Sequence, residues 1–109
     1  MDKIKIYHTL KGLAISPACK GYVYINEAMN LIEADVNISK CKLYKQIAEI
    51  YNSTPSRVER ALRHIVQRGL VFGNIDNWRE IFGYNISVHN CGLTNGDFLW
   101  GLYRYLEVH

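Results

Sequence analysis

The stretch "TPSRVERALRHIVQRG", residues 54–69, combines a helix start signal with a concentration of arginine. Thr54 followed by Pro55 is typical of a helix N-terminus, because threonine caps the first turn and proline lacks only an amide that would be unpaired there anyway. Aliphatic residues then recur every three or four positions. This spacing predicts a helix from Pro55 to Phe72 that ends at Gly73 in a left-handed conformation.

On a helix of 3.6 residues per turn, this segment separates into two faces. One face collects the candidates for the core, which are Val58, Ala61, Leu62, Ile65, Val66 and Gly69. The opposite face is centred on Ser56, Arg60, Arg63 and Gln67, with Arg57, Glu59, His64 and Arg68 beside them. Gly69 predicts a local weak point of up to about 1 kcal/mol relative to alanine.

The charge of the whole protein is concentrated on this segment. Residues 57–68 carry four arginines and one glutamate, a net charge of +3, and the 109-residue chain with its 13 Lys+Arg and 10 Asp+Glu is also at +3. The rest of the chain is therefore balanced. Because most charged stripes are solvated helix faces, the charge alone leaves the partner open.

A shorter amphipathic segment precedes the stripe. In "KLYKQIAEIYN", residues 42–52, one side carries Leu43, Ile47, Ile50 and Tyr51. A supporting helix over Leu43–Tyr51, a polar turn and a well-capped second helix form the layout of a helix-turn-helix, whose second helix lies in the major groove of DNA.

The N-terminal part of the second helix carries residue types that suit base recognition. Arginine can donate two parallel hydrogen bonds to guanine, and glutamate can accept one from cytosine. Glu59 therefore has two interpretations: it discriminates between bases, or it stabilises the helix dipole from the first turn. His64 likewise contacts phosphate or is an ordinary surface residue.

Two helices are predicted before the helix-turn-helix. Residues 2–16 suit a short helix that buries Ile4, Tyr7 and Leu10, although the alternation of Ile4 and Ile6 also fits a strand. Residues 16–35 form a clearer helix, with one face composed of Tyr22, Ile25, Met29 and Ile32.

The C-terminal third predicts two more helices. Asp76 would cap a short one that ends at Gly83, with Trp78, Ile81 and Phe82 pointing inward. Residues 84–93 resemble a strand through Ile86 and Val88, but their brevity favours an extended loop. Thr94 and Asp97 form a capping box before an apolar stripe of Phe98, Leu102 and Leu106, widened by Leu99 and Tyr105. The fold class is all-α, with about six helices.

Composition limits the kind of protein this is. A chain of 109 residues with 49% hydrophobic and 21% charged residues suits one globular domain. The three cysteines are an odd number with wide spacing, which fits a reducing compartment. The chain has neither an 18-residue apolar run nor a signal peptide, which predicts a cytoplasmic protein without a membrane partner.

No motif in the sequence indicates catalysis or cofactor binding. His89 and Cys91 form an H-x-C pair, but without a second ligand cluster a zinc site is not predicted. No paired nucleophile and base and no phosphate-binding glycine loop occur. We therefore predict no enzyme, no metal and no cofactor, and assign Trp78 and Trp100 to core or interface packing.

Five separated stretches occur in an order that is typical of a known family. They are "KGYVYINEAM" (residues 20–29), "SRVERALRHIV" (56–66), "GNID" (73–76), "IFGY" (81–84) and "TN" (94–95). Together they resemble the DNA-binding effector domain of the sporulation response regulator, stage-zero sporulation protein A. The resemblance covers the chain from Tyr7 to Glu107.

The resemblance implies a domain of six helices that controls transcription at a short operator containing guanine and cytosine. It implies that Glu59 and Arg60 approach base edges, while Arg57, Arg63 and His64 serve the groove and the backbone around them. Ser56, Gln67 and Arg68 join the second group by their place on the helix. The implied partners are double-stranded DNA, a tandem copy of the domain and the sigma subunit of RNA polymerase.

The chain departs from the family pattern in two respects. Family members carry an N-terminal receiver domain, which nothing here resembles, so residues 1–109 are expected to form a single effector domain, either an excised fragment or a free-standing relative. The connection in "DVNISKCKLY", residues 35–44, is also shorter than usual. The competing hypothesis is a protein-interaction module whose basic helix docks an acidic partner.

Overall fold

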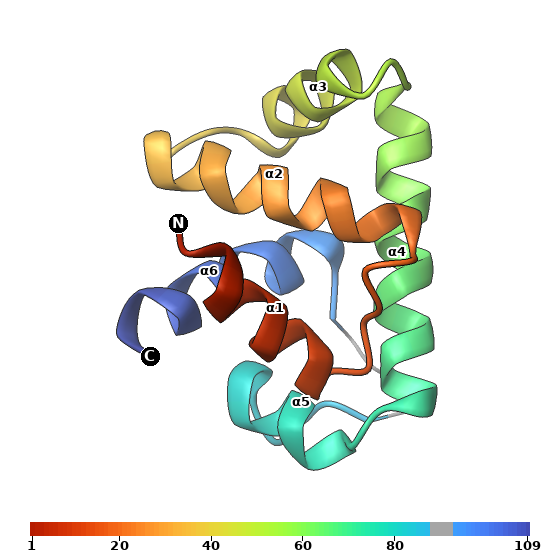
Figure 1. The fold of residues 1–109 in the computed structure, drawn as a ribbon, viewed down its shortest axis with the longest axis vertical. Coiled ribbons are helices and arrows are strands. Elements are labelled where there is room, and N and C mark those ends of the chain that lie inside the picture. The colour runs from red at the N-terminus through yellow and green to blue at the C-terminus, as the bar shows by residue number, and fades with distance from the viewer. Residues whose placement is uncertain (88–92) are drawn as a thin grey trace.

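The computed structural model describes residues 1–87 and 93–109, which form six helices and no strand (Figure 1). In chain order these are α1 (Lys3–Gly12), α2 (Lys20–Ala34), α3 (Lys40–Ile50), α4 (Pro55–Phe72), α5 (Ile75–Phe82) and α6 (Asn95–Val108). The predicted all-α class is therefore confirmed.

The longest helix, α4, forms one edge of the molecule (Figure 1). Its main packing partners are α2 and α3, while α6 lies against α2, α4 and α5. The first turn of α2 reaches α4, and α3 meets the start of α4 (Figure 1). One continuous core fills the space between the helices and leaves the outer side of α4 uncovered by other helices.

The helix α4 has the bounds that its sequence predicts. The hydroxyl of Thr54 accepts a hydrogen bond of 3.2 Å from the amide of Arg57, and Pro55 is the first helical residue. The predicted core face is buried, with Ala61 half-buried. The buried residues are Val58, Leu62, Ile65, Val66, Gly69 and Leu70.

The two glycines at the end of α4 have a different role from the predicted one. A Cβ atom on Gly69 would lie 2.5 Å from Cζ2 of Trp78 and 2.8 Å from the carbonyl oxygen of Leu13. Gly69 is thus a close-approach site and not a weak point. The prediction for Gly73 was also wrong: its φ of −90° is not left-handed. Its Cβ would meet the oxygen of Gly69 at 2.6 Å, so crowding explains that glycine too.

The turn between α3 and α4 is held by a defined motif. Asn52 adopts a left-handed φ of 52°, which asparagine tolerates better than most residues. The amide of Ser53 then donates a 2.8 Å hydrogen bond to the carbonyl of Ala48. This arrangement is a Schellman motif, and it fixes the angle at which α4 leaves α3.

The inward faces of α1 and α3 differ from those predicted. In α1 the buried residues are Ile6 and Leu10, while Ile4 is 69% exposed and Tyr7 lies at the surface. The segment is a helix and not the alternative strand. In α3, Tyr44 and Ala48 are buried with Leu43 and Ile47, whereas Ile50 and Tyr51 are exposed. In both helices the predicted stripe included an exposed apolar residue, Ile4 in α1 and Ile50 in α3. The predicted stripe is therefore rotated about the helix axis relative to the buried one.

The α5 segment confirms its predicted end but not its predicted cap. Asn74 caps the helix by accepting a 2.9 Å hydrogen bond from the amide of Asp76, so Asp76 is not the cap. Gly83 terminates the helix with a φ of 105°, as predicted. Trp78 is buried, while Ile81 and Phe82 are half-buried.

The capping box of α6 is confirmed. The amide of Asp97 donates to the hydroxyl of Thr94 over 3.0 Å, and the carboxylate of Asp97 accepts from the amide of Thr94 over 3.4 Å. The apolar stripe is buried as predicted, except that Tyr103 replaces Tyr105 in the core. In the strand-like stretch, residues 84–87 and 93 form no strand, and Val88 lies outside the described residues.

Candidate nucleic-acid interface

All eight predicted site residues lie on the uncovered side of α4. Seven are exposed, namely Ser56, Arg57, Arg60, Arg63, His64, Gln67 and Arg68, and Glu59 is half-buried. The helix therefore presents a continuous polar and basic surface. This surface has two flanks, and each flank borders a hollow between α4 and the neighbouring helices.

The first flank borders a hollow of about 460 Å³ between α2, the α3–α4 turn and α4, which we call the α2-side hollow. Its basic side chains are Lys20, Arg57, Arg60 and His64. The remainder of its lining is uncharged at neutral pH: Tyr24, Tyr51, Asn52, Ser53 and Ala61. This flank is positive and has no acidic residue in its lining.

The close crossing of α2 and α4 places Lys20 beside α4. Gly21 is buried at that crossing, and a Cβ atom there would lie 3.1 Å from the carbonyl oxygen of Ala61 and 3.3 Å from Cδ1 of Ile65. A larger residue would push the first turn of α2 outward. Gly21 is therefore a positioning residue for the adjacent lysine.

The second flank borders a hollow of about 360 Å³ between α3, α4 and the start of α6, which we call the α6-side hollow. It is lined by Lys40, Glu59, Arg63 and Gln67, among others. Arg63 donates to Glu59 over 3.1 Å, one helical turn apart. Glu59 thus offsets one of the two positive charges on this flank, whereas no acidic residue lines the first.

The position of Glu59 separates its two interpretations. No acidic residue lies in the first turn of α4. Because the influence of the helix dipole falls off within one turn, stabilisation of the dipole does not account for Glu59. Its carboxylate instead orients the guanidinium of Arg63 at the surface.

The start of α6 is tied directly to α4. The side-chain amide of Asn95 donates a 2.9 Å hydrogen bond to the main-chain oxygen of Glu59. Tyr44 packs beneath this contact, and its buried hydroxyl has no hydrogen-bond partner among the described residues. Burial raises the pKa of Tyr44, an effect that the neighbouring Asn95 side chain partly offsets.

Ser56 and Arg68 lie away from both hollows. Ser56 borders a third recess, between α3 and the first turn of α4. The guanidinium of Arg68 lies 5.3 Å from the centre of the Phe72 ring, near the C-terminal end of the helix. This distance corresponds to a cation–π contact.

Sequence reasoning missed the residues that other helices contribute, chiefly Lys20, Gly21, Lys40 and Asn95. The stretch "KGYVYINEAM" contains two of them, and it supported the resemblance without suggesting that its lysine meets α4. The missing information is tertiary, because only the packing of α2 and α6 against α4 brings these residues to the basic surface.

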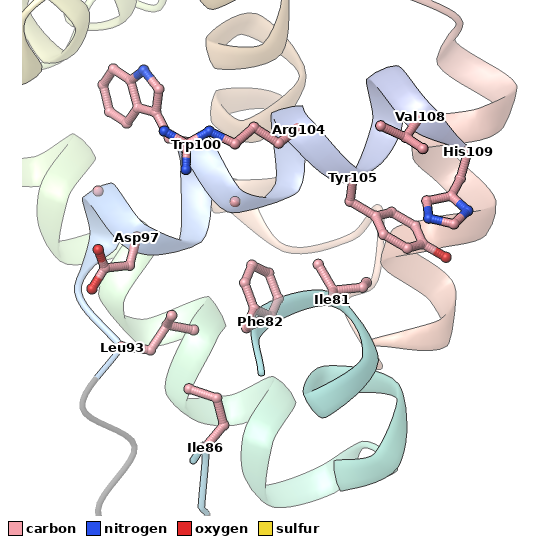
Figure 2. A pocket seen from close by; sticks show the side chains of 12 residues that line it. Ile81, Phe82, Ile86, Leu93, Asp97, Trp100, Arg104, Tyr105, Val108 and His109 are labelled. Carbon is pink, nitrogen blue, oxygen red and sulfur yellow. The ribbon is translucent and has the colours of Figure 1, made fainter. Parts of the chain in front are cut away.

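A hollow larger than these two lies elsewhere in the described part of the chain. A groove of about 630 Å³ runs between α5 and α6, and no residue of α4 lines it. Figure 2 shows Ile81 and Phe82 extending from α5 toward α6. Trp100, half-buried, belongs to this groove, while Trp78 is in the core and donates to the oxygen of Gly69 over 3.1 Å.

Other candidate features stay apart from this surface. Within residues 1–87 and 93–109 no group of three metal-ligating side chains gathers, and Cys19 and Cys41 are free thiols. His89 and Cys91 lie outside the described residues. No helix in the described part of the chain is long and apolar enough to span a membrane.

Comparison with known families identifies the family of the chain. The family model for the sporulation initiation factor Spo0A C terminal matches residues 6–106 of the chain. The chain belongs to the Spo0A C-terminal family. Members of the Spo0A C-terminal family are DNA-binding response-regulator effector domains, not a known class of enzyme. The predicted resemblance, the DNA partner and the helical class are thereby confirmed.

Proposed function

We propose that this protein is a sequence-specific transcription regulator whose helix α4 lies in the major groove of an operator. The observation that carries the proposal is the uncovered side of α4, where exposed basic side chains line an edge that no other helix shields. A helix of this diameter fits the major groove, and its cations release the counterions of the phosphate backbone.

The proposed division of labour follows the position of each side chain. Arg60 lies near the centre of the outer face and makes no ion pair among the described residues, so its guanidinium is free to meet guanine. Glu59 would accept from cytosine. The groove and backbone contacts would come from Ser56, Arg57, Arg63, His64, Gln67 and Arg68.

The finer partners belong to the same proposal. Residues 1–109 would act as one effector domain, with the helix-turn-helix at residues 43–72. Two copies would bind in tandem and extend the footprint on DNA. The sigma subunit of RNA polymerase is a proposed partner on the resemblance alone.

The first test is fluorescence anisotropy with two labelled duplexes, a family-type operator and a scrambled sequence, across a series of salt concentrations. We expect an operator preference of about a thousandfold that survives near physiological salt. Equal and weak binding that vanishes with salt would reject the proposal and favour a module that docks an acidic protein.

The second test is Arg60→Ala, with Arg104→Ala on α6 as a charge-matched control. Loss of a bidentate contact to guanine should cost about 1–3 kcal/mol on the operator and relax the preference at one base pair. The control should leave that preference unchanged. If Arg60→Ala bound both duplexes as the wild type does, the base-reading role would be wrong.

A further inference from the structure

The α2-side hollow collects positive charge from two separate helices. Lys20 comes from α2, while Arg57, Arg60 and His64 come from α4. None of these four side chains forms an ion pair among the described residues. Lys20, Arg57 and Arg60 carry like charges that repel one another, and an anion seated between them would offset the repulsion.

The acidic residue beside this hollow acts on another group. Burial, followed by the negative charge of Glu27, raises the pKa of Tyr51. Tyr51 lines the hollow, whereas Glu27 does not. No acidic side chain is therefore part of the lining of the hollow.

We propose that the α2-side hollow seats a phosphate of the DNA backbone and that Lys20 is a phosphate contact outside the helix-turn-helix. The inference rests on the proposed function, since the phosphate belongs to a strand that borders the groove holding α4. The major groove is about 12 Å wide and a helix with its side chains about 10 Å, so a phosphate chain runs along each flank of α4. A flexible ammonium group suits phosphate without reading sequence.

The structure makes Lys20 suitable for this role through its neighbour. Because Gly21 allows α2 to press against Ala61 of α4, the first turn of α2 lies over the same side of α4 as Arg57 and His64. A lysine at the start of an isolated helix would be one of many surface charges. Here it borders one hollow with three side chains of the recognition helix.

The test compares Lys20→Ala with Lys3→Ala, which removes the same charge from the same first-turn position of a different helix. We expect Lys20→Ala to weaken binding to operator and scrambled duplexes alike and to lower the slope of log K against log salt by about 0.9. Lys3→Ala should change neither quantity, and Lys20→Arg should restore the slope.

A series of operators with single neutral methylphosphonate linkages then locates the contact. At one linkage the neutral substitution should weaken binding of the wild type. The same substitution should not weaken binding of Lys20→Ala any further, because that variant already lacks the contact. If Lys20→Ala matched Lys3→Ala while Arg60→Ala still relaxed sequence preference, this inference would fail and the proposed function would stand. If the wild type showed no operator preference, both would fail.

Two further outcomes would also overturn the inference. A change in the ratio of operator to scrambled affinity for Lys20→Ala would mean that Lys20 reads bases. A loss of affinity for Lys20→Ala that leaves the salt slope unchanged would mean that Lys20 does not act through a phosphate.

Discussion

The packed side of α4 near its C-terminal end and the outer side near its N-terminal end serve opposite purposes. The C-terminal half packs so tightly that Gly69 has no room for a methyl group beneath Trp78. The N-terminal half carries three exposed arginines on its outer side, and two of them, Arg57 and Arg60, form no ion pair among the described residues. One helix thus provides a fixed support on its packed side and a candidate recognition surface on its outer side, which His64, Gln67 and Arg68 continue toward the C-terminal end.

The contrast predicts which property of the protein a substitution in α4 changes, its stability or its DNA binding. A substitution on the packed side of the C-terminal half acts on the free energy of unfolding, because close-packed cores resist added volume. A substitution on the outer side of the N-terminal half acts on the free energy of DNA binding. Two substitutions test this separation, and a third tests a buried group of α3 that packs beside α4.

The largest expected effect is that of Gly69→Ala. The new methyl group would clash with Trp78 and with the carbonyl of Leu13, so we expect a loss of about 3 kcal/mol in the free energy of unfolding. Urea denaturation measures it. The matched control is Gly96→Ala, where the methyl group would meet only the flexible end of Lys40 and the Thr94 hydroxyl at ordinary distances. A stable Gly69→Ala protein would contradict the account of this half.

An intermediate effect is expected for Glu59→Gln in the other half. The ion pair to Arg63 is exposed, so stability should change by less than about 0.5 kcal/mol. Removing the negative charge should strengthen binding to the scrambled duplex while operator preference falls about tenfold. Anisotropy titrations on both duplexes give the two numbers. An unchanged preference would exclude Glu59 from base reading.

The smallest effect is expected for Tyr44→Phe, beneath the α6-side hollow. Burial raises the pKa of Tyr44 above its ordinary value of 10.0, so the unfolded chain ionises first. The free energy of unfolding of the wild type is therefore highest well below pH 10, and it falls as the pH rises through the folded-state pKa of Tyr44. Denaturation at pH 8 and pH 10.5 should show a smaller loss for Tyr44→Phe than for the wild type.

At pH 8 the phenylalanine variant should be equal to the wild type or more stable by up to about 1 kcal/mol, because the lost hydroxyl has no partner among the described residues. Tyr84→Phe is the control, since Tyr84 is 86% exposed. Equal losses in Tyr44→Phe and the wild type between the two pH values would mean that Tyr44 does not titrate as a buried group.

The sequence predicts α4 well because its signals are local and agree with one another. Thr54, Pro55 and the aliphatic spacing define its start and its faces without help from other helices. The capping box of Thr94 and Asp97 is local in the same way. These features required no knowledge of how the chain packs.

Features that depend on packing could not be predicted. Ile4 and Ile50 continue apolar stripes yet lie at the surface, since the positions of neighbouring helices decide which side is covered. Gly69 reads as a helix weakness until Trp78 is placed against it. Lys20 joins the candidate site only because α2 crosses α4 at Gly21.

The ion pair between Glu59 and Arg63 has a further consequence, for the speed of recognition. From beyond a Debye length of about 8 Å, a closed ion pair is nearly neutral and exerts little pull on DNA. The unpaired cations of the opposite flank would then dominate the long-range attraction and orient the approach. We expect salt to slow association chiefly through that flank, while the exchange of Arg63 between Glu59 and DNA affects how long the complex lasts.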